Sequence, residues 1–228
     1  DFGITTLTDE KRYGLALVLG GGEVKLLEMT AAYSVFADDG IKNNTIFISE
    51  IRDSKGNLIE KANPTRFRVL PVQVARQIND VLSDNNARAP MFGANSSLYL
   101  PNYQAAAKTG TTQDTRDAWC MGYTPTLVVG TWVGNNDNSP MTQGGAVASG
   151  PMWKDFMEAV LPKFAKEDFT PPQVVVQDKP MLDGTTGSTN HSILYYINKN
   201  NPQSNDTSQN DSQFFNWESA VQNWAGNY

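Results

Sequence analysis

The sequence predicts an α+β fold in which an antiparallel sheet packs against helices. Two apolar segments, 117–123 and 127–134, are separated by a proline-containing connection of three residues. So short a connection makes them antiparallel neighbours. Residues 103–112 are expected to add a third strand at the outer edge. Apolar residues recur at helical spacing in 23–38 and 151–164, and these two helices are expected to cover the sheet.

The first helix is predicted over residues 23–38. Its apolar stripe consists of Val24, Leu27, Ala31 and Val35, widened by Leu26, Met29, Tyr33 and Phe36. So wide a stripe predicts a helix that is packed on much of its circumference. Gly40 is expected to cap the C-terminal end. The glycines at 20–22 are interpreted as the turn that enters this helix, because neither a Walker lysine nor a dinucleotide-binding spacing follows them.

A hairpin, a strand and a second helix are predicted next. A turn at 54–57 joins two apolar segments, and a further strand follows at 66–70. Pro71 opens the helix at a position where proline is tolerated. The buried row of this helix is either Val74, Ile78 and Val81 or Ala75, Ile78 and Leu82. Residues 83–86 are polar and loop-like, and 87–102 are expected to be irregular.

The last predicted helix covers residues 151–164. Its apolar side consists of Trp153, Phe156, Val160 and Phe164. The composition changes after this helix, so we divide the chain into a domain at 1–165 and a C-terminal extension at 166–228. A tract at about 198–212 is built from Asn, Ser, Gln and Asp and has no means of forming a core. Aromatic residues near the C-terminus are expected to dock onto the domain.

Composition excludes several classes of function. The net charge of −6 over 228 residues gives no support for nucleic-acid binding. The single cysteine, Cys120, excludes an internal disulfide and a multi-cysteine metal site, and its strand position indicates a buried, inert thiol. The only histidine, His191, lies among Ser, Thr and Asn, which argues against a catalytic triad or a metal site. We expect no cofactor, no metal and no membrane-spanning segment in this chain.

The segment 105–112, Ala-Ala-Ala-Lys-Thr-Gly-Thr-Thr, carries the candidate functional residues. Strand alternation places Lys108 and Gly110 on one face and Thr109 and Thr111 on the other. Glycine weakens a strand, so its presence indicates close approach of a ligand or another backbone. A peptide pairing with this edge would clash with a Cβ at position 110, and lysine and threonine can hold an anion. A Lys-Thr-Gly triplet by itself, however, favours the interpretation as an ordinary surface strand with a turn.

The residues around the triplet are far more specific. It continues through Asp117-Ala118-Trp119 and Trp132-Val133-Gly134, with Leu19-Gly20-Gly21-Gly22-Glu23-Val24 upstream and Gly150-Pro151-Met152-Trp153-Lys154 downstream. Over about residues 1–165 the chain resembles the C-terminal part of the transpeptidase domain of class A penicillin-binding proteins, which belong to the serine β-lactam-recognising superfamily. The resemblance implies a penicillin-binding-protein/β-lactamase-like α+β fold.

The resemblance also implies roles for the motif. In this family a Ser-x-x-Lys, a Ser-x-Asn and a Lys-Thr-Gly strand meet in one cleft. By resemblance, Lys108 hydrogen-bonds the Ser-x-Asn serine, and the hydroxyls of Thr109 and Thr111 bind the terminal carboxylate of a D-alanyl peptide or a penicillin. The Thr111 N–H is expected to be an oxyanion donor. Lys108 and Thr111 are the candidate catalytic residues, and Lys108, Thr109, Gly110 and Thr111 the candidate substrate-binding residues.

The nucleophile motif is missing from the chain. No serine has a lysine three residues later. Ser-x-Asn occurs at Ser83, Ser188 and Ser208, but the pattern is common in a Ser/Asn-rich chain, and the family order places it upstream of residues 23–38. We therefore interpret the chain as part of a domain whose upstream half supplies the nucleophile, and we expect it to be inactive alone.

Partners and location follow from the same resemblance. The parent protein is expected to be a serine-type D-Ala-D-Ala transpeptidase that cross-links peptidoglycan stem peptides and is acylated by β-lactams. It is expected on the extracytoplasmic face of the bacterial cell membrane, anchored through an upstream segment absent here. Two alternatives stay open: a β-lactam hydrolase or sensor of the same superfamily, and a non-catalytic peptidoglycan-binding module. The Asp117-Ala118-Trp119 context favours the transpeptidase.

Overall fold

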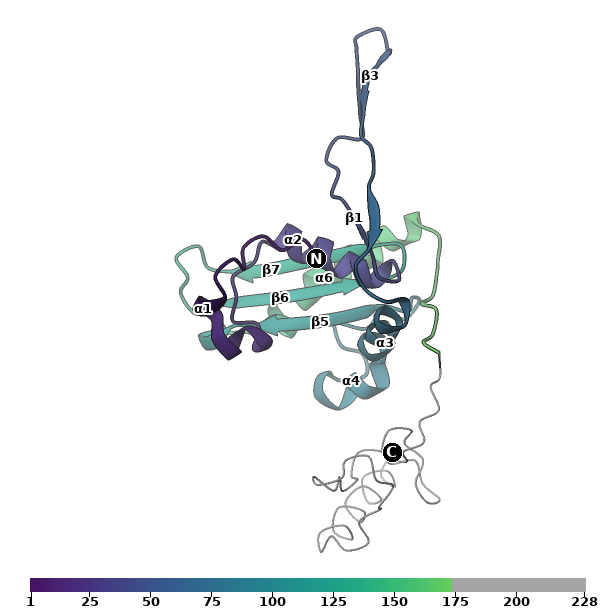
Figure 1. The fold of residues 1–228 in the computed structure, drawn as a ribbon. Helices are drawn as coiled ribbons and strands as arrows, with labels where there is room; N and C mark the ends of the chain where they lie inside the picture. The colour runs from purple at the N-terminus through teal and green to yellow at the C-terminus, as the bar shows by residue number, and fades with distance from the viewer. Residues whose placement is uncertain (174–228) are drawn as a thin grey trace, which may run out of the picture. The chain divides into compact units, whose positions relative to one another are not determined.

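The predicted three-stranded antiparallel sheet is present in the computed structural model, which describes residues 1–173 (Figure 1). Its strands are β5 (Ala106–Thr111), β6 (Asp117–Tyr123) and β7 (Val128–Gly134), in the order β5-β6-β7. β5 therefore has β6 on one side and a free edge on the other. Gly110 pairs with Trp119 in the β5–β6 register. The strand that carries the Lys-Thr-Gly motif is thus the edge strand, as the sequence predicts.

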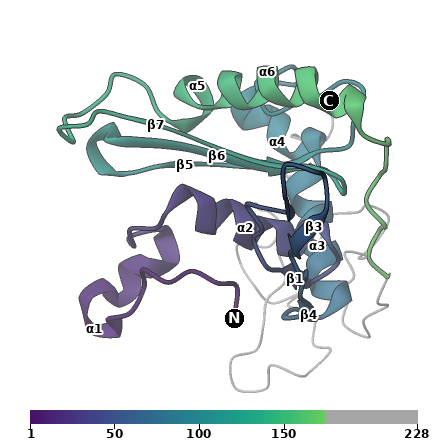
Figure 2. The same cartoon turned by 90° about the horizontal axis from the view of Figure 1, so that it is seen from above.

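Helices cover both faces of this sheet (Figure 2). Helix α2 (Leu26–Ala37) packs on β6 and β7 from one side, with α3 (Val72–Ser83) beside it. Helices α5 (Gly145–Ala148) and α6 (Gly150–Val160) pack on the other side. The arrangement of a helical layer on each face of an antiparallel sheet confirms the predicted α+β class.

The core beneath α6 is built from a different helix row than predicted. Trp153, Met157 and Leu161 are buried, whereas Phe156 and Phe164 are about half exposed. Both rows are apolar in sequence, so periodicity does not choose between them. Trp153 belongs to both rows, and Gly122 on β6 accommodates it: a Cβ there would lie 2.4 Å from the Trp153 ring, so its absence creates a recess for the indole.

The core beneath α2 is an aromatic cluster around the buried Tyr123. Its ring contacts those of Tyr33, Phe36 and Phe169. Phe169 lies beyond residue 165 yet is buried in this cluster, so the described chain packs on the domain past the boundary that the composition suggested. The boundary itself stays a prediction.

Helix α2 is less enclosed than predicted. Only Ala32 and Val35 of this helix are buried, and Leu26 and Leu27 are exposed. Its C-terminal end follows the prediction, because Gly40 adopts a left-handed φ of +89° and donates its N–H to the Val35 carbonyl. The apolar stripe is therefore buried only in the C-terminal half of the helix, and its N-terminal end is exposed.

Helix α3 begins after Pro71 and uses the second of the two predicted rows. Ala75 is buried, Ile78 and Leu82 are partly buried, and Val81 is exposed. The polar Asn79 is also buried, which the apolar pattern did not predict.

The prediction of an irregular segment at 87–102 is wrong for residues 87–92, because helix α4 spans Asn85–Phe92, and it is confirmed for 93–102, which contain no helix or strand. Asp84 caps its N-terminus by accepting a 2.9 Å hydrogen bond from the Ala87 N–H. Gly93, with a φ of +84°, ends it. The helix was missed because Pro90 lies within it, where proline is normally unfavourable.

Two small antiparallel pairs form an arm between α2 and α3. They are β1 (Ile41–Asn43) with β4 (Arg66–Arg68), and β2 (Glu50–Arg52) with β3 (Leu58–Lys61). The β2–β3 pair confirms the hairpin predicted around residues 54–57, and β4 lies within the strand predicted at 66–70. The pairing with β1 was not predicted.

Three short helical turns precede β6 in the chain. They are α1 (Glu10–Tyr13) and the 3₁₀ turns Gly14–Leu19 and Gln113–Thr115. Gly20 follows the first 3₁₀ turn with a φ of +93°. Gly20 thus ends that 3₁₀ turn. The expectation that it lies in the turn that enters α2 is wrong, because α2 begins only at Leu26. A last 3₁₀ turn, Leu161–Lys163, extends α6.

Several sequence predictions lie outside the described residues. They are the tract at 198–212, the aromatic C-terminus, His191, Ser188 and Ser208.

Candidate functional site

Strand β5 directs its side chains to two faces. Ala107 belongs to the core beneath α6, together with Cys120 and Trp153. Its neighbour Ala106 belongs to the aromatic cluster beneath α2. Because side chains alternate along a strand, Lys108 and Gly110 share the α2 face, and Thr109 and Thr111 share the α5 and α6 face.

The backbone of β5 alternates in the same way between β6 and the free edge. The Thr112 N–H donates to the Asp117 carbonyl across the β5–β6 turn. The Ala107 carbonyl instead accepts from Arg88, and the Thr109 carbonyl accepts from the Lys108 ammonium at 2.7 Å. In an antiparallel pair, alternate residues direct both backbone groups away from the partner. The N–H of Thr111 therefore points to the free edge.

The hydroxyl of Thr111 is fixed from the other side of the strand. Gly145, the first residue of α5, donates its N–H to Thr111 Oγ1 at 2.9 Å. A hydroxyl has one proton to donate and two lone pairs that accept. The Gly145 bond occupies a lone pair and leaves the proton available to a ligand. The side chain of Thr111 is exposed, so a ligand has access to it.

Lys108 is exposed, and Gly110 is partly exposed on the same face. A Cβ at position 110 would lie 3.5 Å from the Trp119 Cβ, which is an ordinary contact. Nothing in the described residues therefore requires glycine at this position. The clash with an incoming peptide remains the predicted reason for it.

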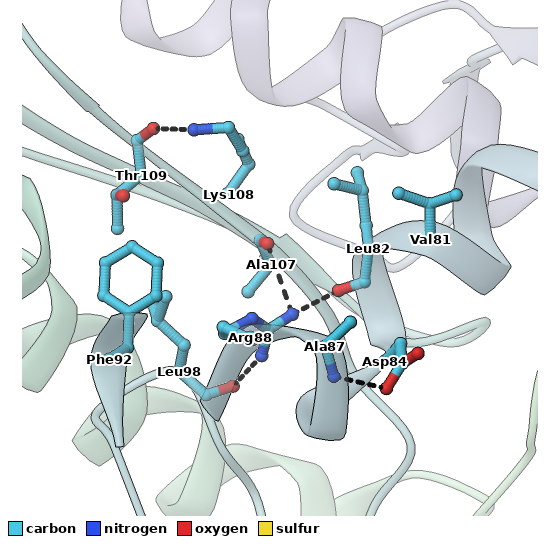
Figure 3. Close-up of a pocket in the computed structure, with 10 residues that line it drawn as sticks. All are labelled: Val81, Leu82, Asp84, Ala87, Arg88, Phe92, Leu98, Ala107, Lys108 and Thr109. Carbon is cyan, nitrogen blue, oxygen red and sulfur yellow. Dashed lines mark hydrogen bonds between the residues drawn. The ribbon is translucent and has the colours of Figure 1, made fainter. Parts of the chain in front are cut away.

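A cavity of about 210 Å³ lies beside the N-terminal half of β5 (Figure 3). Helices α3 and α4 form its other walls. The lining residues are Val81, Leu82, Asp84, Ala87, Arg88, Phe92, Leu98, Ala107, Lys108 and Thr109. Two residues of the motif thus line the same cavity as the cation of Arg88.

Arg88 ties three backbone segments together at this cavity. Its guanidinium donates to the carbonyls of Leu82, Leu98 and Ala107. Burial lowers the pKa of Arg88. Of the outward backbone groups of β5, the Ala107 carbonyl is therefore bound by Arg88 and the Thr109 carbonyl by Lys108. Sequence reasoning missed Arg88, because its partners lie on three separate segments.

Cys120 and Ser83 do not join the motif. Cys120 is fully buried in the core beneath α6, and burial raises the pKa of its thiol to about 12, which confirms the prediction of an inert cysteine. Ser83 ends α3, where its hydroxyl donates to the Asp80 carbonyl at 3.4 Å and accepts from the Gln104 amide at 3.5 Å. It is absent from the lining of the cavity.

Within residues 1–173, no cluster of His, Cys, Asp and Glu has the size and geometry to hold a metal ion. None of the helices in that range is both long and apolar enough to cross a bilayer.

Comparison of the sequence with protein families matches residues 13–158 to the penicillin binding protein transpeptidase domain. Penicillin-binding protein 1A of Aquifex aeolicus is 36% identical over 165 residues, which are 71% of this chain and 22% of that protein. Penicillin-binding protein 1A of Neisseria lactamica is 30% identical over 64% of this chain and 19% of its own length. The chain thus spans about a fifth of these relatives.

Solved structures agree with the sequence comparison. The penicillin-binding protein PonA1 from Mycobacterium tuberculosis matches with a TM-score of 0.62 and 26% identity, over 70% of this chain and 44% of that one. PonA1 in complex with penicillin V matches with a TM-score of 0.59 and 28% identity over the same shares. The family match covers more than half of the chain and includes the edge strand with its Lys-Thr-Gly motif. The chain therefore belongs to the transpeptidase domain family of the class A penicillin-binding proteins.

Proposed function

We propose that this chain supplies the substrate-binding edge of a peptidoglycan D-Ala-D-Ala transpeptidase. One observation carries the proposal: β5 has a free edge on which the Thr111 N–H points outward while Gly145 holds the Thr111 hydroxyl. A peptide can pair with such an edge through its main chain. The adjacent hydroxyls of Thr109 and Thr111 would then meet its terminal carboxylate, and the ammonium of Lys108 would keep the electrostatic field of the site positive.

The chemical step needs a nucleophile that the 228 residues do not supply in the family's form. Their serines include no Ser-x-x-Lys. We place the nucleophile on another segment of the same domain, so that its oxygen attacks the D-Ala-D-Ala carbonyl and forms an acyl-enzyme. The Thr111 N–H would stabilise the oxyanion of the tetrahedral intermediate. The hydroxyl proton of the nucleophile passes to the amine of the leaving D-alanine. The amine of a second stem peptide then attacks the acyl-enzyme and forms the new amide bond, while the acyl–oxygen bond breaks and a proton of that amine returns to the nucleophile.

β-Lactams would enter the same site. The PonA1 structure in complex with penicillin V supports this part of the proposal, since it matches this chain at 28% identity. A penicillin carries a carboxylate beside its reactive amide, so it can use the same hydroxyls as the D-alanyl terminus. The parent protein would act at the cell wall, outside the bacterial cytoplasmic membrane.

The absence of Ser-x-x-Lys favours one second candidate, a non-catalytic module that binds peptidoglycan peptides through the same edge. A fluorescent penicillin distinguishes the two. The full-length protein and the 228-residue chain are each incubated with it, separated on a denaturing gel and mapped by mass spectrometry. We expect covalent label on the full-length protein only, at a serine outside these residues. A labelled serine within the 228 residues would overturn the proposal that the nucleophile lies on another segment. An unlabelled full-length protein would favour the binding module.

A further inference from the structure

The turn at Gly144 and Gly145 lies directly against the Lys-Thr-Gly strand. A Cβ at Gly144 would come within 2.8 Å of Thr111 Oγ1 and 3.0 Å of its Cγ2. A Cβ at Gly145 would lie 2.6 Å from the Gly110 carbonyl oxygen and 3.2 Å from the Thr109 Cβ. Neither position has room for a side chain. The turn therefore touches the strand with its backbone alone, close enough for the Gly145 N–H to reach Thr111.

Buried side chains hold this turn from behind. The Ser149 hydroxyl donates to the Gly145 carbonyl at 2.8 Å, and the Thr131 hydroxyl donates to the Ser149 carbonyl at 3.1 Å. Ser149 is fully buried and Thr131 nearly so. The Ser97 hydroxyl donates to the carbonyl of Ala146, the next residue of the turn, at 2.8 Å. The turn is thus anchored to β7, to α6 and to the segment that follows α4.

The anchoring matters because a free threonine hydroxyl has no fixed direction. The Thr111 side chain is exposed, and three staggered rotamers are open to such a side chain when nothing holds it. The Gly145 N–H occupies a lone pair of Oγ1, and the close backbone of Gly144 limits where Cγ2 can lie. Together they select one rotamer and leave the hydroxyl proton free for a ligand.

We propose that Gly144 and Gly145 are positioning residues that fix the Thr111 hydroxyl as a donor to the carboxylate of the substrate. This inference rests on the proposed function, and it adds residues that lie more than thirty positions beyond the motif. The recognised group is a carboxylate at the end of a peptide paired with β5. A rigid donor adds more to the transition state than one that must be ordered on binding.

Gly144→Ala tests the inference in the full-length protein. The added methyl group forces the Thr111 side chain to turn, and the Gly145 bond is lost. We expect the acylation rate constant with a fluorescent penicillin to fall on the order of 10- to 100-fold, as for other small misplacements of a binding group. Gly56→Ala is the matched control: Gly56 has a φ of +84° in the β2–β3 turn, with nothing within 4 Å of an added Cβ. That control is expected to lower the Tm and leave acylation unchanged.

A second substitution separates positioning from loss of stability. Thr111→Ser removes Cγ2, one of the two atoms that the new methyl group overlaps, and keeps the hydroxyl. We expect Gly144→Ala with Thr111→Ser to acylate faster than Gly144→Ala alone, whereas Thr111→Ser in the otherwise native protein gives no such gain. A purely structural role predicts a lower Tm without this rescue.

Each outcome of these experiments supports or overturns one of the two proposals. Native-like acylation by a folded Gly144→Ala variant overturns the inference. Should that variant fail to fold, Ser149→Ala replaces it, because it removes only the bond to the Gly145 carbonyl; unchanged acylation there overturns the inference as well. A full-length native protein that takes no label overturns the proposed function and this inference with it. A labelled native protein with unaffected variants overturns this inference alone.

Discussion

The hydroxyl of Tyr123 donates a 2.8 Å hydrogen bond to Oδ1 of Asn79, and both side chains are almost entirely buried. The Asn79 amide in turn donates to the Phe36 carbonyl at 2.9 Å. This chain of contacts joins strand β6 to helices α3 and α2. Buried polar groups are tolerated where each has a partner, so the network ties three elements together in one arrangement.

Tyr123→Phe is expected to lower the free energy of unfolding by about 1–3 kcal/mol, because it leaves Asn79 Oδ1 buried without its donor. Denaturant unfolding of the parent protein measures the change. Tyr33→Phe is a control in the same aromatic cluster, since no hydrogen bond of the Tyr33 hydroxyl is found among the described residues. Equal stability of Tyr123→Phe and the native protein would contradict the role of the network.

The sheet could be predicted from sequence because its strands and the connection between two of them lie close together along the chain. β6 and β7 are each a short apolar segment, and the connection between them is too short for any other pairing. The apolar row of α6 was misassigned because Phe156 and Phe164 are as apolar as Met157 and Leu161, and only the packing on the sheet separates them. Helix α4 was missed although Asp84 and Gly93 mark its ends; Pro90 in its interior is unfavourable to a helix, so the local signals conflict.

The candidate site likewise has residues that local sequence reveals and residues that only the tertiary structure reveals. Lys108 and Thr111 could be located because they share one strand with a specific sequence context. Arg88 and the turn at Gly144 and Gly145 could not be located, because each acts on the motif across the tertiary structure. A lone arginine and a pair of glycines carry no signal of their partners in sequence.

Gly122→Ala is expected to destabilise the domain by about 1–3 kcal/mol, as overpacking of a filled core does. The new methyl group would lie 2.4 Å from the Trp153 ring. Gly110→Ala on the neighbouring strand is the matched control for stability, because its Cβ meets the Trp119 Cβ at 3.5 Å. Thermal unfolding of both variants checks the contrast, and a similar loss in the two would count against the recess for Trp153.

The carboxylate of Glu28 is expected to fasten the N-terminal segment in a pH-dependent way. The backbone N–H of Thr5 donates to it at 2.8 Å, the Thr5 hydroxyl at 2.7 Å and the Lys25 ammonium at 3.0 Å. These bonds lower the pKa of Glu28 to about 2. A lowered folded-state pKa means that the contribution is complete above the ordinary pKa of 4.5 and is lost as the pH falls toward 2.

Hydrogen exchange at the Thr5 amide measures this contact. Its protection is expected to fall as the pH is lowered from 4.5 to 2, after correction for the intrinsic exchange rate. Glu28→Gln should show weak protection at every pH in that window. A protection factor that is independent of pH in the native protein would exclude the carboxylate as its cause.

Cys120 is expected to resist thiol reagents in the folded protein. Its side chain is fully buried, and burial raises the pKa of the thiol to about 12, so almost no thiolate is present near neutral pH. Iodoacetamide followed by mass spectrometry should modify it only after denaturation. Modification at the same rate with and without denaturant would contradict the packing beneath α6.

Thr111→Val separates the hydroxyl of Thr111 from its backbone N–H. Valine keeps the branched shape and the main-chain donor at the free edge, but it can neither accept from Gly145 nor donate to a carboxylate. A hydrogen bond to a charged group is worth about 1.5–3 kcal/mol, so acylation by penicillin in the full-length protein is expected to slow by roughly 10- to 150-fold.

Thr112→Val, one residue further along the chain, is the control variant, because the Thr112 hydroxyl bonds Asp117 at 2.8 Å and not Gly145. Thr112→Val should lower the free energy of unfolding, because the β5–β6 turn loses this hydrogen bond, and it should slow acylation less than Thr111→Val does. Equal slowing by the two valine variants would mean that the strand needs both hydroxyls for its shape and that neither acts on the substrate.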